Sequence, residues 1–89
     1  MLEREVVVSN KLGLHARASA KLVQRVQGFR STVWLLSAGR EVNAQSIMGV
    51  MMLAAGPGTP LTVRADGPDE QAAVDAVVEL FERKFDEGG

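Results

Sequence analysis

The sequence contains no cysteine and no tyrosine, and it has one histidine and one tryptophan. Without cysteine the chain can form neither disulfides nor thiolate metal sites, and a single histidine cannot build a multi-histidine metal site. No apolar run approaches the roughly 20 residues that a membrane helix requires. The N-terminus also lacks the basic and apolar segments of a secretory signal. We therefore expect a cytoplasmic protein with no metal, no cofactor and no membrane insertion.

An excess of positive charge is also missing. Lysine and arginine total 10, aspartate and glutamate 11, and the formal net charge is -1. General nucleic-acid binding depends on clustered positive charge, so we expect no nucleic-acid partner. The 89 residues are 46% hydrophobic and 24% charged, which is typical of a folded globular protein. This length predicts a single domain over residues 1–89.

The hydrophobic pattern predicts short strands and helices in the order β-α-β-β-α-β-α. This order indicates an α+β fold with an antiparallel or mixed sheet and helices packed on one face. Val7, Trp34, Leu36 and Thr62 are expected on the other face, and residues 86–89 as a frayed tail. Gly28 is expected to close the first helix in the left-handed conformation. The predicted strands cover residues 5–8, 31–36, 40–43 and 61–65, and the predicted helices residues 16–27, 47–53 and about 69–85.

The only histidine, His15, occurs where a loop meets the first predicted helix, and Arg17 follows two residues later. A helix N-terminus presents free N–H groups and partial positive charge, which favour an anion. Neutral imidazole is a nucleophile near neutral pH, and a phosphoryl group on it adds about 1.5 to 2 negative charges. The helix end and Arg17 can stabilise these charges. A simple polar cap is the alternative role for a lone histidine here.

The segment 47–53 is too apolar on all sides for a short surface helix. If Val50 and Leu53 enter the core, other large side chains stay exposed beside His15. Such a patch indicates a partner surface, and methionine suits several partners because it repacks easily. A loop covering Met48 and Met51 is the alternative. The predicted partner-binding surface consists of Ala16, Ala20, Lys21, Gln24, Ile47, Met48 and Met51.

Two motifs, Gly13-Leu14-His15-Ala16-Arg17-Ala18-Ser19 and Ser46-Ile47-Met48-Gly49-Val50-Met51, resemble those of HPr. HPr is the histidine-phosphorylatable carrier of the bacterial phosphoenolpyruvate-dependent phosphotransferase system. The resemblance extends over residues 5–85. It implies an HPr-like open-faced β-sandwich, in which three helices lie on one face of a four-stranded antiparallel sheet.

The resemblance also implies a role for each site residue. His15 would accept a phosphoryl group at Nδ1 from phosphorylated enzyme I and pass it to enzyme IIA domains, and Arg17 would stabilise the phosphate. The protein would be a carrier with a covalent phosphohistidine intermediate, not an enzyme in its own right, and a monomer. Ala18 replaces the family's usual proline. Its retained amide either helps to hold phosphate or loosens the first helical turn.

Ser46 has two interpretations. Serine is a preferred N-cap residue, and Ser46 precedes the short apolar helix. In some HPr proteins the matching serine is phosphorylated by a dedicated kinase, which makes HPr kinase/phosphorylase a candidate partner.

Three alternatives remain. A small RNA-binding module would need stacking aromatics and a basic face, and a carrier with a prosthetic arm on Ser46 would be helical and acidic. Within the family, Gln27-Gly28-Phe29 and residues 80–87 are also similar to NPr, the nitrogen-related branch. The motif Ser46-Ile47-Met48-Gly49 favours HPr of the carbon or mixed-function kind, and the sequence leaves the two branches open.

Overall fold

The computed structural model describes residues 1–87, which form one four-stranded sheet and a set of helices. All neighbouring strands are antiparallel, so the predicted antiparallel arrangement is confirmed. The strands lie in the order β1 (Leu2–Val7), β4 (Pro60–Asp66), β2 (Thr32–Ser37) and β3 (Arg40–Asn43). Each strand differs from its predicted bounds by at most a few residues, and β1 differs most because its charged first half pairs with β4.

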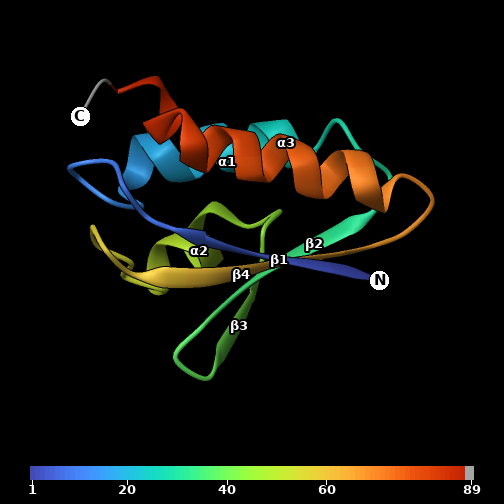
Figure 1. Ribbon diagram of the computed structural model, residues 1–89, viewed down its shortest axis with the longest axis horizontal. Coiled ribbons are helices and arrows are strands. Elements are labelled where there is room, and N and C mark those ends of the chain that lie inside the picture. The colour runs from blue at the N-terminus through green and yellow to red at the C-terminus, as the bar shows by residue number, and fades with distance from the viewer. Residues whose placement is uncertain (88–89) are drawn as a thin grey trace.

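The helices are α1 (Ala16–Val26), α2 (Ile47–Met52) and α3 (Glu70–Glu82), followed by a single 3₁₀ turn, η1 (Lys84–Asp86). The helices α1 and α3 lie side by side over one face of the sheet, and the β2–β3 hairpin extends away from them (Figure 1). The short helix α2 packs against α1 and β3. Among residues 1–87, no helix is both long and apolar enough to cross a membrane.

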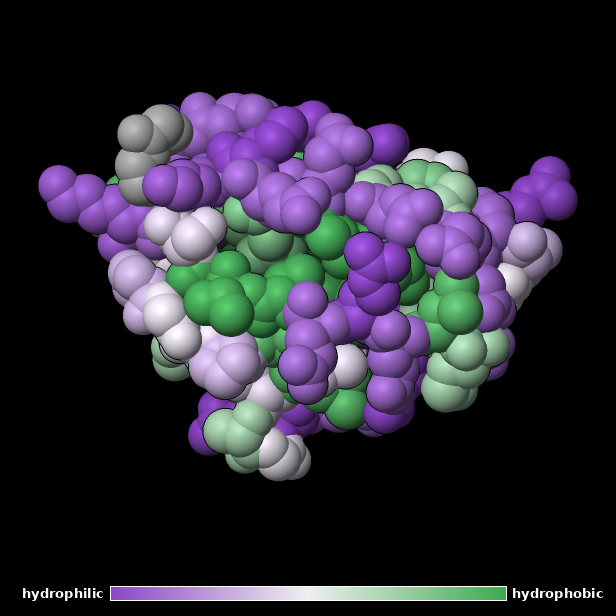
Figure 2. All heavy atoms as spheres, viewed as in Figure 1, coloured by the Kyte–Doolittle hydropathy of each residue, from purple (hydrophilic) through white to green (hydrophobic). Residues whose placement is uncertain are grey.

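The core lies between the sheet and the two long helices. Alternate strand residues such as Val33, Leu35 and Val63 are fully buried, as strand periodicity requires. The predicted stripes of α1 and α3 pack against them. Figure 2 shows hydrophobic side chains gathered beneath α3, whose outer surface is hydrophilic.

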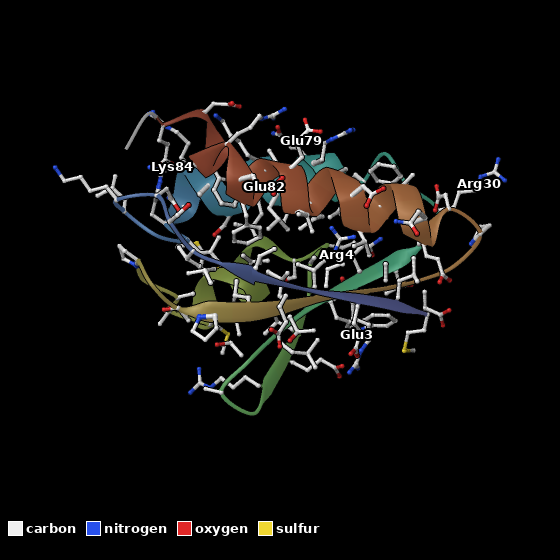
Figure 3. The ribbon with its side chains drawn as sticks, in the orientation of Figure 1. Glu3, Arg4, Arg30, Glu79, Glu82 and Lys84 are labelled. Carbon is white, nitrogen blue, oxygen red and sulfur yellow. The ribbon has the colours of Figure 1, made fainter. Side chains whose placement is uncertain are left out.

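The pleat of β1 separates charges onto the two faces of the sheet. Arg4 points toward α3, where its Nη1 lies 3.9 Å from Asp75, whereas Glu3 points to the open face and accepts a 2.6 Å hydrogen bond from Arg64 (Figure 3). On that open face Trp34 is half-buried. The residues expected there, Val7, Trp34, Leu36 and Thr62, are all partly or largely exposed, which confirms the prediction.

The prediction that the first helix stops at Gly28 is confirmed, but the left-handed conformation expected for Gly28 is wrong. The helix α1 ends at Val26, and its C-cap Gln27 keeps right-handed helical angles and donates to the Val23 carbonyl. Gly28 also lies outside the left-handed region, and its N–H donates to the Arg25 carbonyl at 3.2 Å. A tightened last turn therefore closes this helix, without the left-handed cap that glycine usually provides.

Candidate functional site

His15 is the N-cap of α1. Its backbone is extended, with φ -76° and ψ 180°, and its carbonyl accepts the Ser19 N–H at 2.9 Å. Its ring turns back over the helix start, where Nδ1 accepts the Arg17 N–H at 3.3 Å. The ring nitrogen therefore performs the capping role that serine or aspartate oxygen usually fills. The side chain keeps 27% of its surface exposed, so a partner can reach it.

The loop before His15 is held by the loop after α2. The Leu14 N–H donates to the Ala55 carbonyl at 2.9 Å. Gly13 has φ +66°, and a Cβ there would lie 2.5 Å from the same carbonyl oxygen. Only glycine allows both this backbone conformation and this close approach. Because Leu14 is itself buried, the position of His15 is coupled to the C-terminal end of α2.

The second ring nitrogen of His15 meets a carboxylate. Nε2 contacts Oε2 of Glu87, 72 residues later in the chain. The other oxygen of Glu87, Oε1, accepts a 3.0 Å hydrogen bond from Nδ2 of Asn10. This hydrogen bond, with further contributions from His15 and Lys21, holds the pKa of Glu87 below its usual value. Glu87 is therefore a carboxylate at neutral pH.

A left-handed turn brings Glu87 to His15. Lys84, Phe85 and Asp86 have φ of 54°, 53° and 61°, a conformation that costs roughly 1–2 kcal/mol for each non-glycine residue. Two contacts of the middle residue oppose this cost. The Phe85 ring is fully buried edge-on against Phe81, with ring centroids 4.9 Å apart, and its carbonyl accepts Lys21 Nζ at 2.7 Å.

The prediction of a frayed tail is therefore wrong for Asp86 and Glu87. Both have defined positions and contacts, and Glu87 lines the candidate site. Gly88 and Gly89, which were part of the same prediction, lie outside the described residues.

His15 opens onto a shallow depression of about 690 Å³. Arg17 lies at its border and is exposed, and within residues 1–87 its guanidinium makes no hydrogen bond or ion pair. This leaves the guanidinium available for an anion at Nδ1. Lys21 is less available, since its Nζ also lies 3.8 Å from Asp86. The depression is lined by Leu12, His15, Ala16, Arg17, Lys21, Asp86 and Glu87.

The helix α2 presents the apolar patch that the sequence predicts. Ser46 caps it, since its Oγ accepts the Gly49 N–H at 3.0 Å, and Val50 is fully buried. Met48 is 69% exposed, so the alternative in which a loop covers it is wrong. Among residues 1–87, α2 holds four of the seven large hydrophobic side chains that are exposed: Ile47, Met48, Met51 and Met52.

The residues predicted on α1 are exposed to different degrees. Ala16 and Gln24 are exposed, whereas Ala20 and Lys21 are half-buried. Ala18 is fully buried in the first turn, which forms with helical geometry without the proline expected from the resemblance. Two residues of the site, Asn10 and Glu87, were not predicted. No spacing signal connects them to His15, although both have polar side chains that can bind its ring or its loop.

The fold and the site together define a class. A four-stranded antiparallel sheet with two long helices on one face, and a histidine capping the first helix, is an open-faced β-sandwich with an imidazole ring at its surface. The family model described as "PTS HPr component phosphorylation site" matches residues 2–83. The chain belongs to the HPr family of phosphocarrier proteins of the phosphotransferase system.

Individual relatives agree with this assignment. The chain is 61% identical over 87 residues to phosphocarrier protein HPr of Xylella fastidiosa strain 9a5c, covering 98% of both chains. HPr of Thermoanaerobacter tengcongensis has a similar crystal structure, with a TM-score of 0.94, 42% identity and 98% coverage of both chains. Phosphocarrier protein NPr of Shewanella violacea is 41% identical over 86 residues, covering 97% of this chain and 94% of NPr. The family excludes the RNA-binding module and the carrier with a prosthetic arm.

Proposed function

We propose that the protein carries a phosphoryl group on Nδ1 of His15, which it accepts from phosphorylated enzyme I and passes to enzyme IIA domains. The capping geometry of His15 carries this proposal: Nδ1 faces the Arg17 N–H at the positive end of α1, so a phosphoryl group on Nδ1 would lie where an anion is stabilised. Membership of the HPr family supports the same role.

The transfer needs little machinery. The Nδ1 lone pair attacks phosphorus, the donor's bond to phosphorus breaks, and its electron pair returns to the donor. Charge on the phosphoryl oxygens is then stabilised by the free N–H groups of the first turn and by Arg17. The protein turns over nothing alone, because its phosphohistidine is an intermediate between two partners.

The docking surface proposed for both partners combines α2 with the start of α1. Large exposed apolar side chains favour association, and flexible methionines let one surface accept more than one partner. The contact between Leu14 and Ala55 keeps this surface at a constant position relative to His15. The surface consists of Ala16, Ala20, Lys21, Gln24, Ile47, Met48 and Met51.

We further propose that the protein works in the cytoplasm as a monomer and that Ser46 is a regulatory site for HPr kinase/phosphorylase. Ser46 is exposed at the border of the docking surface, so a kinase can reach its hydroxyl. Phosphate there would place about two negative charges beside the apolar side chains that meet enzyme I.

The NPr-type role in a nitrogen-related regulatory system is the second candidate. The segment Gln27-Gly28-Phe29 and residues 80–87 favour it, whereas the higher identity to HPr relatives favours the carbon branch. Phosphorylation rates with the enzyme I of each system, measured on the same preparation, would separate the two roles.

The central experiment is incubation with phosphoenolpyruvate and enzyme I. We expect one phosphoryl group per wild-type chain, labile in acid and stable in alkali, and none on His15→Ala. Thermal melting of His15→Ala shows whether the variant is folded. Phosphate on folded His15→Ala, or none on the wild type with a competent enzyme I, would contradict the proposal.

A further inference from the structure

The two ring nitrogens of His15 have opposite surroundings. Nδ1 faces a donor, the Arg17 N–H, and Nε2 faces an acceptor, Oε2 of Glu87. A neutral imidazole carries one proton. With the proton on Nε2 both contacts are favourable. With the proton on Nδ1, two N–H groups oppose each other at one nitrogen and a lone pair opposes a carboxylate at the other.

Glu87 is held independently of His15. Nδ2 of the buried Asn10 donates to Oε1 of Glu87 at 3.0 Å and to the Gly13 carbonyl at 2.8 Å. Reversing the Asn10 amide would place its oxygen against both acceptors, so these contacts determine its orientation. The loop before α1 and the turn after α3 thus both hold the carboxylate in place.

The charges around this carboxylate favour its ionised form. Lys21 lies on the α1 side, and its positive charge contributes to holding the pKa of Glu87 low. Asp86 is adjacent in the chain, but it pairs with Lys21 and with Arg83. Arg17 borders the same depression. Among residues 1–87, Glu87 is therefore the acidic group in contact with the imidazole, and it keeps its charge at neutral pH.

We propose that Glu87 is a positioning residue that holds the ring proton of His15 on Nε2 and so presents Nδ1 as the nucleophile. A carboxylate that orients imidazole and selects its tautomer performs this task in hydrolytic triads. The use of the tautomer rests on the proposed phosphocarrier function, whereas the tautomer itself is a property of the unmodified protein.

The Nε2 proton of His15 contributes to both directions of phosphoryl transfer. When Nδ1 forms its bond to phosphorus, the Nε2 proton stays and the ring becomes a cation paired with Glu87. When an acceptor attacks phosphorus, the bond to Nδ1 breaks, its electron pair returns to Nδ1, and neutral imidazole leaves. Loss of the Nε2 proton beforehand would make imidazolate the leaving group, which is far poorer. Glu87 therefore keeps the phosphorylated ring ready for transfer.

The experiment is ¹⁵N NMR of the His15 ring in the unphosphorylated wild type, Glu87→Ala and the control Glu82→Ala. Glu82 is exposed at the end of α3, so its variant removes the same charge nearby. The spectra are recorded at about pH 8.5, two units above the pKa of histidine in model peptides, so that the ring is neutral. At this pH we expect the wild type and the control to carry the proton on Nε2. In Glu87→Ala the fraction with the proton on Nδ1 should rise about fivefold, as expected for loss of one ordinary hydrogen bond.

A second measurement follows the phosphorylated proteins. The pH at which phosphohistidine loses its Nε2 proton should fall by about half to one unit in Glu87→Ala and stay constant in the control. If that pH is the same in Glu87→Ala as in the wild type, the role of Glu87 after phosphorylation is overturned.

The two proposals fail in different ways. An unchanged tautomer fraction in Glu87→Ala overturns the positioning role, whatever the phosphorylation result. Failure of the wild type to accept phosphate overturns the carrier function instead, and the tautomer measurement then still decides the role of Glu87.

Discussion

The carboxylate of Asp69 accepts a 2.6 Å hydrogen bond from the hydroxyl of Ser31, 38 residues earlier in the chain. It also accepts the backbone N–H groups of Ser31 at 2.9 Å and Arg30 at 3.0 Å. Although Asp69 occupies the N-cap position of α3, it makes no side-chain bond to that helix. It connects the start of α3 to the residues that lead into β2, and the Ser31 hydroxyl and Arg30 amide lower its pKa.

This arrangement predicts an acid-dependent loss of stability. Because folding lowers the pKa of Asp69, the stabilisation is fully present above the unfolded value and is lost as the pH falls through the folded value. The urea midpoint of Asp69→Asn should therefore lie below that of the wild type at about pH 7 and approach it at about pH 2.5. If the urea midpoints of Asp69→Asn and the wild type differ by the same amount at both pH values, the charge of Asp69 does not contribute to stability.

The approach of Gly13 to Ala55 predicts a strong effect of a single methyl group. In Gly13→Ala the new Cβ meets the Ala55 oxygen at 2.5 Å in a left-handed conformation, so we expect a loss of more than about 2 kcal/mol. Gly56→Ala is the control, because Gly56 lies in the same contact region, has no positive φ and has open space at its Cβ. Urea unfolding of both variants measures the difference, and equal losses would contradict the prediction.

Local patterns were sufficient to predict most of the fold. Alternation identifies Val33 and Leu35 as core residues, and a serine before an apolar segment predicts the Ser46 cap. The apolar repeat of α1 begins just after His15 and likewise predicts this residue at a helix start. These features depend on neighbours a few residues away, which a sequence displays directly.

The contact between His15 and Glu87 could not be predicted in this way. It depends on three consecutive left-handed residues without glycine, which local propensity argues against. Packing of Phe85 against Phe81, at the end of α3, and the hydrogen bond from Lys21 stabilise that turn, and Lys21 lies on α1, 64 residues before Phe85. The acidic end of the chain therefore looks like a solvated tail until α1 and α3 are packed together.

Removal of the Arg17 side chain should affect transfer but not folding. Within residues 1–87 its guanidinium has no hydrogen-bonding partner, and exposed substitutions usually change stability by less than about 0.5 kcal/mol. We expect Arg17→Ala to accept phosphate from enzyme I at least about tenfold more slowly, with a melting temperature within a few degrees. Arg25→Ala removes the same charge from α1, where its guanidinium lies over Phe29, and should transfer normally. Normal transfer by Arg17→Ala would contradict the assignment.

Substitutions of Ser46 should separate helix capping from docking. Ser46→Ala loses the acceptor for the Gly49 N–H and should cost about 1 kcal/mol. Asparagine and aspartate both retain a capping oxygen, so Ser46→Asn and Ser46→Asp differ in charge alone. The negative charge favours the N-terminus of α2 by roughly 0.3–1 kcal/mol, so Ser46→Asp should be at least as stable as Ser46→Asn.

The same charge in Ser46→Asp should weaken docking to enzyme I, although it stabilises α2. The charge of Ser46→Asp must be desolvated when an apolar partner surface closes over Ile47, Met48 and Met51, so association with enzyme I weakens although the domain is intact. We expect Ser46→Asp to need a higher enzyme I concentration for half-maximal His15 phosphorylation, and Ser46→Asn to behave as the wild type. Because the charge stabilises the free helix and destabilises the complex, melting temperature and apparent affinity must change in opposite senses. If Ser46→Asp and Ser46→Asn show the same apparent affinity, Ser46 lies outside the docking surface and serves only as the cap of α2.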